Sequence, residues 1–317
     1  MPIIPKRLSP GDTIGLVSPS SAPADPKAID RSVALFEKLG YKVKLGRHAR
    51  ERWGFLAGRD RERAADLMQM FTDRRVHGIV CIRGGYGAAR ILPLLDYRAI
   101  KKNPKVLVGF SDITNLHCAL LRHANLLTFQ GPMTAHQLIK PDYPPYSHDC
   151  FRRIITEPAP IGGICAGYPL KTVSIVRHGK ASGQLIGGNL TVLTHLIGTP
   201  FEPSFRGKIL LLEDVDEVPY RIDRMLTHLL NAGKLQQVAG VAVGVCQNCE
   251  DPTAKKSREY RQSLEDVLRE RLSPLKVPVV TGLPFGHADH NATLPIGGRA
   301  TLDANRGDLI ITQAAVS

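Results

Sequence analysis

Three polar side chains with catalytic potential follow apolar runs at widely separated places in the chain. Ser111 comes directly after "KVLVGF", Glu213 ends "KILLLE", and His287 follows "PVVTGLPFG". A serine hydroxyl becomes a nucleophile when an imidazole takes its proton, and a carboxylate commonly orients that imidazole. The chain order serine, acid, histidine is one that such triads use. The three residues are therefore candidates for nucleophile, acid and base.

Ser111 also has a purely structural interpretation. With Asp112 it stands where a helix is expected to begin, and both residue types are common helix caps. The nucleophile signature GxSxG is not met, because position 113 is Ile. If a helix starts here, its free N–H groups and partial positive charge would also suit an oxyanion. Local sequence leaves both interpretations open.

The acid and the base each have a competitor nearby. Asp214 directly follows Glu213, and His290 lies three residues after His287. A carboxylate at a strand end can equally be a helix cap or a surface group.

A glycine-rich stretch, "RGGYG" (83–87), follows the apolar run "HGIVCI". Glycines let the backbone approach a ligand closely, so their N–H groups could form part of an oxyanion hole. Phosphate binding is the rival use, although the stretch fits neither GxGxxG nor the Walker pattern.

The elements that must position these residues alternate between strand and helix. We expect strands at 12–20, 41–46, 77–82 and 105–110, and helices at 25–40, 60–73 and 111–124, from their apolar spacing and from their Asp, Ser and Gly boundaries. This alternation predicts an α/β fold, a doubly wound parallel sheet with helices on both faces. Ligands of such sheets bind beyond the carboxyl ends of the strands, where Gly85 and Ser111 would lie.

The second half predicts another α/β domain, richer in strand. We expect strands within 170–188, at 207–215 and 238–246, and from 278 through the tail, with helices at 189–198, 218–233 and 257–273. Six prolines fall between Lys140 and Pro169. We therefore expect an N-terminal domain at 1–150, a linker at 151–169 and a C-terminal domain at 170–317.

Composition limits the partners. The formal net charge is +13, which favours anionic ligands. The densest basic stretch, Arg47–Arg63, contains three acidic residues and lacks the aromatic interleaving of a single-strand binder, so nucleic acid is not the expected partner. No apolar run resembles a signal peptide or membrane span, which predicts no membrane association and a cytoplasmic location.

The six cysteines include one CxxC, at Cys246 and Cys249. A structural zinc site would need two further ligands at similar spacing, and none is nearby in the sequence. A redox role would require the motif to open a helix. A chain of 317 residues needs no disulfides to fold, which suits a reducing compartment.

Five blocks of sequence together resemble the LD-carboxypeptidase family of serine peptidases, which includes murein tetrapeptide carboxypeptidases and microcin C self-immunity peptidases. They occur in the family's order and span nearly the whole chain: "CIRGGYGAARILPLLDY", "GFSDITNLH", "GQLIGGNLTVL", "LLLEDVDEVPYRIDRML" and "LPFGHADHNATLPIG".

The resemblance implies roles for particular residues. The family's nucleophile falls on Ser111, its acid on Glu213 and its base on His287, while backbone N–H groups at Gly85 and Asp112 would form the oxyanion hole. It also implies an N-terminal α/β sandwich, no metal or other cofactor, a homodimer, and a small anionic muropeptide as substrate.

Three functions are therefore compared. The first is hydrolysis of an L,D-peptide bond that releases a C-terminal D-amino acid from a murein tetrapeptide, with a peptidyl-nucleotide amide as the alternative substrate. The second is a phosphate-binding α/β enzyme that uses the glycine-rich stretch with the acidic cluster and Mg²⁺. The third is a two-lobed binding protein without catalysis.

Overall fold

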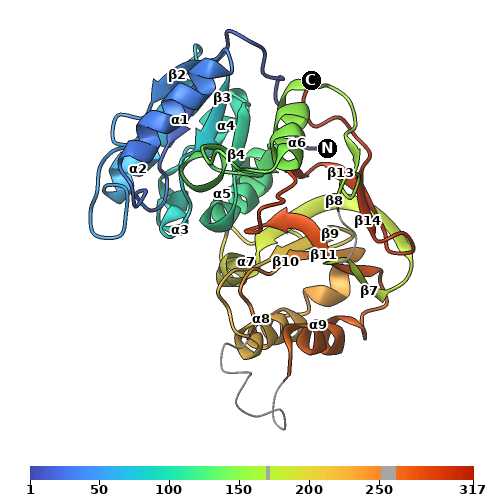
Figure 1. The fold of residues 1–317 in the computed structure, drawn as a ribbon. Coiled ribbons are helices and arrows are strands. Elements are labelled where there is room, and N and C mark those ends of the chain that lie inside the picture. Colours follow the sequence, from blue (N-terminus) through green and yellow to red (C-terminus); the bar gives the residue numbers. More distant parts are fainter. Residues whose placement is uncertain (169–171, 251–261) are drawn as a thin grey trace.

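The chain folds around two β-sheets, each carrying helices (Figure 1). The computed structural model describes residues 1–168, 172–250 and 262–317. None of the helices in these ranges is long and apolar enough to cross a bilayer.

The N-terminal sheet has six strands in the order β12-β5-β4-β3-β1-β2. Its five N-terminal strands are parallel, and β12 pairs with β5 in the antiparallel sense. Their bounds are Thr13–Val17 (β1), Lys42–Leu45 (β2), Gly78–Cys81 (β3), Val106–Gly109 (β4), Thr128–Gln130 (β5) and Leu294–Ile296 (β12).

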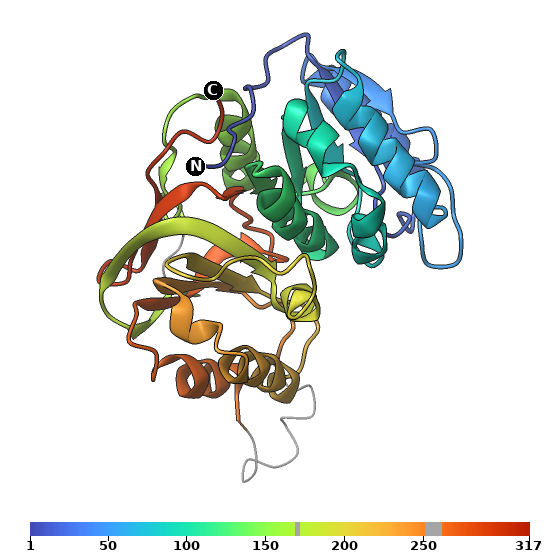
Figure 2. The same cartoon turned by 180° about the vertical axis from the view of Figure 1, so that it is seen from behind.

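Helices cover both faces of this sheet, as predicted. Alternate residues of β1 point to opposite faces: Ile14 and Leu16 pack with α1, while Val17 packs with α2. Figure 1 shows α1 in front of the sheet and Figure 2, from behind, shows α2. The helices of this half are α1 (Lys27–Lys38), α2 (Asp60–Thr72), α3 (Ala88–Ile91), α4 (Tyr97–Lys102), α5 (Thr114–Ala119) and α6 (Pro145–Thr156).

The second sheet has eight strands in the order β6-β14-β13-β8-β9-β10-β11-β7. The four central strands β8 to β11 run parallel, so their carboxyl ends share one edge. The bounds are Gly162–Gly163 (β6), Ser174–Arg177 (β7), Lys180–Asn189 (β8), Ile209–Glu213 (β9), Gly240–Val245 (β10), Val279–Gly286 (β11), Arg299–Asp303 (β13) and Asp308–Ile311 (β14).

Three helices pack on one face of this second sheet: α7 (Leu190–Leu196), α8 (Pro219–Asn231) and α9 (Leu264–Leu272). Their apolar side chains belong to the same buried cluster as those of α2 and α5. One apolar core therefore continues from the N-terminal half into the C-terminal half, and the two sheets pack against each other through it.

Two features of the structure bear on the expected domain plan. The boundary at residue 150 falls inside α6, and the predicted linker begins within that helix. Pro145 stands in the first turn of α6, where a backbone N–H would have no partner within the helix, so this proline can begin the helix. In addition, β12 returns from the C-terminal half to the edge of the N-terminal sheet. The start of the helix expected at 257–273 lies outside the described residues.

Candidate active site

Ser111 stands at a sharp turn between β4 and α5. The strand ends at Gly109, and Ser111 has a φ of 62°, a left-handed conformation that non-glycine residues seldom adopt. Such a conformation costs on the order of 1–3 kcal/mol and is typical of functional turns. The Ser111 hydroxyl forms no hydrogen bond with any residue in the described ranges, so it caps no helix. The strand–turn–helix geometry of a nucleophile is present here without the GxSxG pattern.

Glu213 and His287 meet at the carboxyl edge of the second sheet. Nδ1 of His287 lies 2.6 Å from Oε2 of Glu213, whose side chain is completely buried. Gly286 permits this approach: its φ is 110°, and a methyl group there would lie 2.8 Å from Oε2 of Glu213. The structure thus brings together the two residues that the sequence analysis named as candidate acid and base.

The environment of His287 favours its charged form. Burial lowers the pKa of His287, but the negative charge of Glu213 and the hydrogen bond that the ring donates to this carboxylate outweigh burial, so the pKa lies above its ordinary value. Asp214 and Asp216 add to this effect. A carboxylate in this position also selects the tautomer that leaves Nε2 free to accept a proton.

The serine turn and the imidazole come from different sheets and lie side by side. The ring of Phe110, the residue before Ser111, is 4.7 Å from the ring of His287 between centroids. On the other side, a methyl group on Gly84 would come within 3.1 Å of Cβ of Ser111. No hydrogen bond joins Ser111 to His287 among the described side chains, and catalytic hydrogen bonds are often long without substrate.

The glycine-rich loop lies against the serine turn. Gly85 has a φ of 96°, and a methyl group there would lie 2.6 Å from Oγ of Ser21. Within the ranges that the structure describes, the N–H groups of Gly85 and Asp112 donate to no carbonyl or side chain. Two backbone donors beside the serine turn are what an oxyanion hole requires.

The competing acid and base have other partners. Asp214 accepts hydrogen bonds from the side-chain amide of Asn189 at 3.0 Å and from the backbone and hydroxyl of Thr191. Burial and the charge of Glu213 raise the pKa of Asp214. His290 packs against the rings of Tyr146 and Tyr168. Among the described contacts, only Glu213 hydrogen-bonds to His287.

Sequence reasoning missed the residues that connect the parts of the site. The hydroxyl of Thr114, in the helix after Ser111, accepts a hydrogen bond from the backbone N–H of Asn189 at 3.0 Å, which joins the two sheets. Ser147 of α6 is fully buried; its hydroxyl donates to the carbonyl of Asp289 and accepts from the N–H of Asn291, which tethers the His287 loop. Only long-range pairing reveals such contacts.

The CxxC motif lies beside the acidic strand end. Between its cysteines, Gln247 donates its N–H to the carbonyl of Asp214 at 3.0 Å and accepts from the N–H of Asp216 at 2.9 Å. The cysteines follow β10 and open no helix. In the described ranges, no three His, Cys, Asp or Glu side chains are grouped to hold a metal ion.

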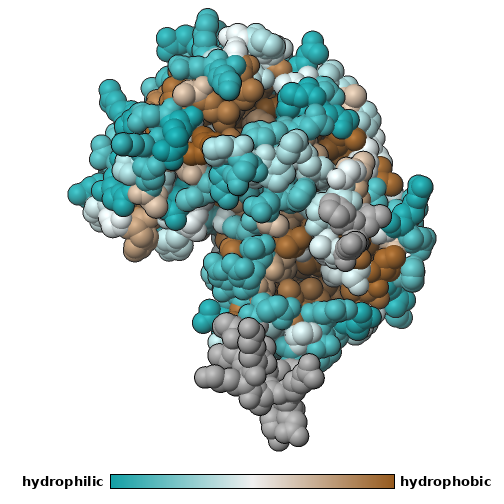
Figure 3. Space-filling model, in the orientation of Figure 1, coloured by the Kyte–Doolittle hydropathy of each residue, from teal (hydrophilic) through white to brown (hydrophobic). Residues whose placement is uncertain are grey.

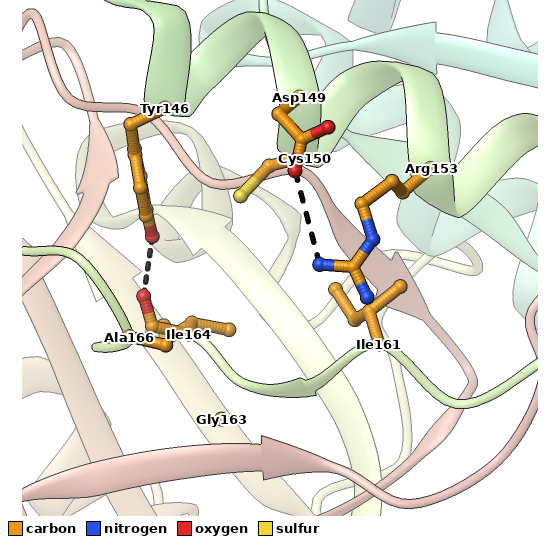
Figure 4. A pocket seen from close by; sticks show the side chains of 8 residues that line it. All are labelled: Tyr146, Asp149, Cys150, Arg153, Ile161, Gly163, Ile164 and Ala166. Carbon is orange, nitrogen blue, oxygen red and sulfur yellow. Dashed lines mark hydrogen bonds and ion pairs between the residues drawn. The ribbon is translucent and has the colours of Figure 1, made fainter.

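Two hollows lie away from these residues. Figure 3 shows a largely hydrophilic surface with apolar groups gathered between α1 and α6, where Leu8, Leu39 and Tyr143 help to line a groove of about 910 Å³. A smaller pocket of about 90 Å³ lies between α6 and β6, with Cys150 beside the Asp149–Arg153 ion pair (Figure 4). A pocket of this volume has room for only a few water molecules and is too small for a peptide.

Comparison with known proteins identifies the family of this chain. Residues 14–131 match the LD-carboxypeptidase N-terminal domain and residues 182–302 match the LD-carboxypeptidase C-terminal domain. The chain belongs to the LD-carboxypeptidase family, and it is a peptidase of that class. A relative from Bacillus subtilis, "Probable murein peptide carboxypeptidase", is 39% identical over 99% of this chain and 95% of its own length.

Solved structures of the family have the same fold. The muramoyltetrapeptide carboxypeptidase from Oxalobacter formigenes is 31% identical, covers 94% of this chain and 97% of its own, and superposes with a TM-score of 0.81. The microcin C7 self-immunity protein MccF in complex with aspartyl sulfamoyl adenosine is 26% identical over the whole of both chains, with a TM-score of 0.89.

Proposed function

We propose that this chain is a serine LD-carboxypeptidase that hydrolyses an L,D-peptide bond and releases the C-terminal D-amino acid of a murein tetrapeptide, as in peptidoglycan recycling. The observation that carries the proposal is the buried Glu213–His287 hydrogen bond beside the strained turn of Ser111. The names of the Bacillus and Oxalobacter proteins support the substrate class.

In this proposal each residue has a defined role. The Ser111 oxygen attacks the carbonyl carbon before the terminal D-residue, and its proton passes to Nε2 of His287. His287 then gives that proton to the leaving amine, and a water molecule activated by the same imidazole releases the acyl group from Ser111. Glu213 orients the ring and stabilises the imidazolium. The N–H groups of Gly85 and Asp112 stabilise the oxyanion; one such donor is worth roughly 2.7–4 kcal/mol in comparable sites.

Incubation with an L,D-linked tetrapeptide tests the proposal. We expect the protein to release a terminal D-amino acid, and we expect Ser111→Ala to reduce the rate by about 10⁴-fold or more, as loss of a triad nucleophile does elsewhere. Release at equal rates by both preparations would refute the serine mechanism. Stable binding without release by either would favour a binding protein.

A peptidyl-nucleotide amide is the alternative substrate, favoured by the similarity to MccF in complex with aspartyl sulfamoyl adenosine. Competition between the tetrapeptide and an aminoacyl sulfamoyl nucleoside in one assay ranks the two by kcat/KM. A higher kcat/KM for the nucleoside would reassign the substrate. A cytoplasmic location and a homodimer complete the proposal, and sedimentation of the purified protein tests the dimer.

A further inference from the structure

We propose that the side-chain carboxylate of Asp112, together with the buried guanidinium of Arg63, is a positioning device that sets the separation of the two oxyanion donors. The inference rests on the proposed function and goes beyond it, because that function uses only the backbone N–H of Asp112. The carboxylate has a different partner: the loop that carries the other donor, Gly85.

The Asp112 carboxylate joins three separate segments. Its Oδ2 atom accepts from the hydroxyl of Ser20 at 2.6 Å and from the backbone N–H of Ala88 at 2.7 Å, and Oδ1 accepts from the side-chain amide of Asn115 at 2.9 Å. Ala88 is the first residue after the glycine-rich loop, and Ser20 follows β1. Asp112 is only 3% exposed, so water does not compete for these bonds.

Arg63 holds the same loop through a backbone carbonyl. Its guanidinium donates to the carbonyl of Gly87 at 2.9 Å and also to the carbonyl of Pro19. The side chain is 1% exposed, and Asp60 is its ion-pair partner. Burying a guanidinium costs free energy of desolvation, and hydrogen bonds to its N–H groups offset that cost. Arg63 thus binds the last carbonyl of the loop, and Asp112 binds the next N–H.

Ser21 completes the attachment of the loop. Its N–H donates to the carbonyl of Gly84, and its hydroxyl accepts from the N–H of Tyr86, both at 3.1 Å. The segment Ser20–Ser21 is itself held by Asp112 through Ser20. Since an oxyanion hole works only when both donors reach one oxygen at about 2.7–3.1 Å, a loop free to move by an ångström would lose one donor. Asp112 therefore carries one donor and fixes the other.

A fluorophosphonate probe tests this inference without a peptide substrate. The Ser111 oxygen displaces fluoride from phosphorus, the serine proton passes to His287, and the phosphoryl oxygen occupies the oxyanion hole. Labelling is followed by the intact mass of the protein. We expect Asp112→Ala to slow labelling of Ser111 at least about 10-fold, which does not exceed the effect of losing one oxyanion donor. In tetrapeptide hydrolysis, kcat should fall by a similar factor while KM stays within about twofold.

Two further variants separate positioning from general destabilisation. Asp66 is 4% exposed and bonds to the backbone and ring of His48, away from the glycine-rich loop, so Asp66→Ala should label within about twofold of the unmodified protein. Ser20→Ala removes one bond to Asp112 and should slow labelling about two- to fivefold. If Asp112→Ala does not fold, Ser20→Ala decides the question.

The outcomes distinguish the two proposals. If the unmodified protein is not labelled at Ser111, the serine mechanism fails. If it is labelled, and Asp112→Ala or Ser20→Ala reacts at the same rate, the positioning role fails while the serine mechanism stands. Equal slowing by Asp66→Ala and Asp112→Ala would also overturn the positioning role.

Discussion

The charge of Glu213 raises the pKa of His287, and this effect should be visible in the pH dependence of activity. The imidazole acts as a base only when neutral, and its pKa lies above the ordinary value of about 6.5 despite burial. Activity should therefore rise with pH through that elevated pKa and fall as acid protonates the ring.

We predict that Glu213→Gln shifts the acidic limb of the kcat/KM profile to lower pH, because the charge that raises the pKa of His287 is gone. The plateau should fall by about 10³- to 10⁴-fold, since the neutral amide no longer stabilises the imidazolium. The measurement is kcat/KM for the tetrapeptide between pH 5 and 9.

Asp216→Asn is the matched control for this prediction. Asp216 raises the pKa of His287 by its charge but makes no hydrogen bond to the ring. We expect a smaller shift of the limb in the same direction with the plateau retained. An acidic limb that stays in place in Glu213→Gln would contradict the assigned partnership.

At the scale of elements, the candidate site lies at the ends of strands, and helix α6 holds the loop that follows one of these strands. The loop after β11 bears His287 and is fastened to α6 by Ser147, through the carbonyl of Asp289 and the N–H of Asn291. Helix α6, which spans the expected domain boundary at residue 150, thus supports the loop of the proposed base.

We predict that Ser147→Ala lowers kcat about three- to tenfold and lowers the free energy of unfolding by about 1–3 kcal/mol, because the buried N–H of Asn291 and the partly buried carbonyl of Asp289 lose their partner. Ser32→Ala is the control: Ser32 is also fully buried in a helix, but its hydroxyl bonds only to Ala28 of α1. Kinetics and urea unfolding of both variants provide the test. Equal kcat values for the two would count against a supporting role for α6.

At the scale of the whole molecule, charge and the shared core act over longer distances. A formal net charge of +13 favours the approach of anionic ligands, such as the proposed peptide substrate, before any contact forms. The apolar cluster spans both halves, and the ring of Phe110, next to Ser111, lies against the ring of His287 from the other sheet.

We predict that kcat/KM for the anionic tetrapeptide falls several-fold as ionic strength rises from about 0.01 to 0.3 M, since the screening length shortens from about 30 Å to less than 8 Å. Labelling by an uncharged fluorophosphonate over the same range is the control and should change little. A flat salt dependence for the peptide would rule out long-range attraction as part of substrate capture.

Local patterns in the sequence determined the elements and the candidates. Strand–helix alternation predicts the N-terminal sheet, and apolar runs before Ser111, Glu213 and His287 predict that all three lie at strand ends. Such features are predictable because hydrophobic periodicity and boundary residues are local properties of a single helix or strand. Only the tertiary structure decided that Glu213 and not Asp214 contacts His287, that β12 returns to the first sheet and that Asp112 bonds to Ala88. These depend on pairing between segments far apart in the chain, and no local preference of the residues encodes which distant backbone or side chain will be their partner.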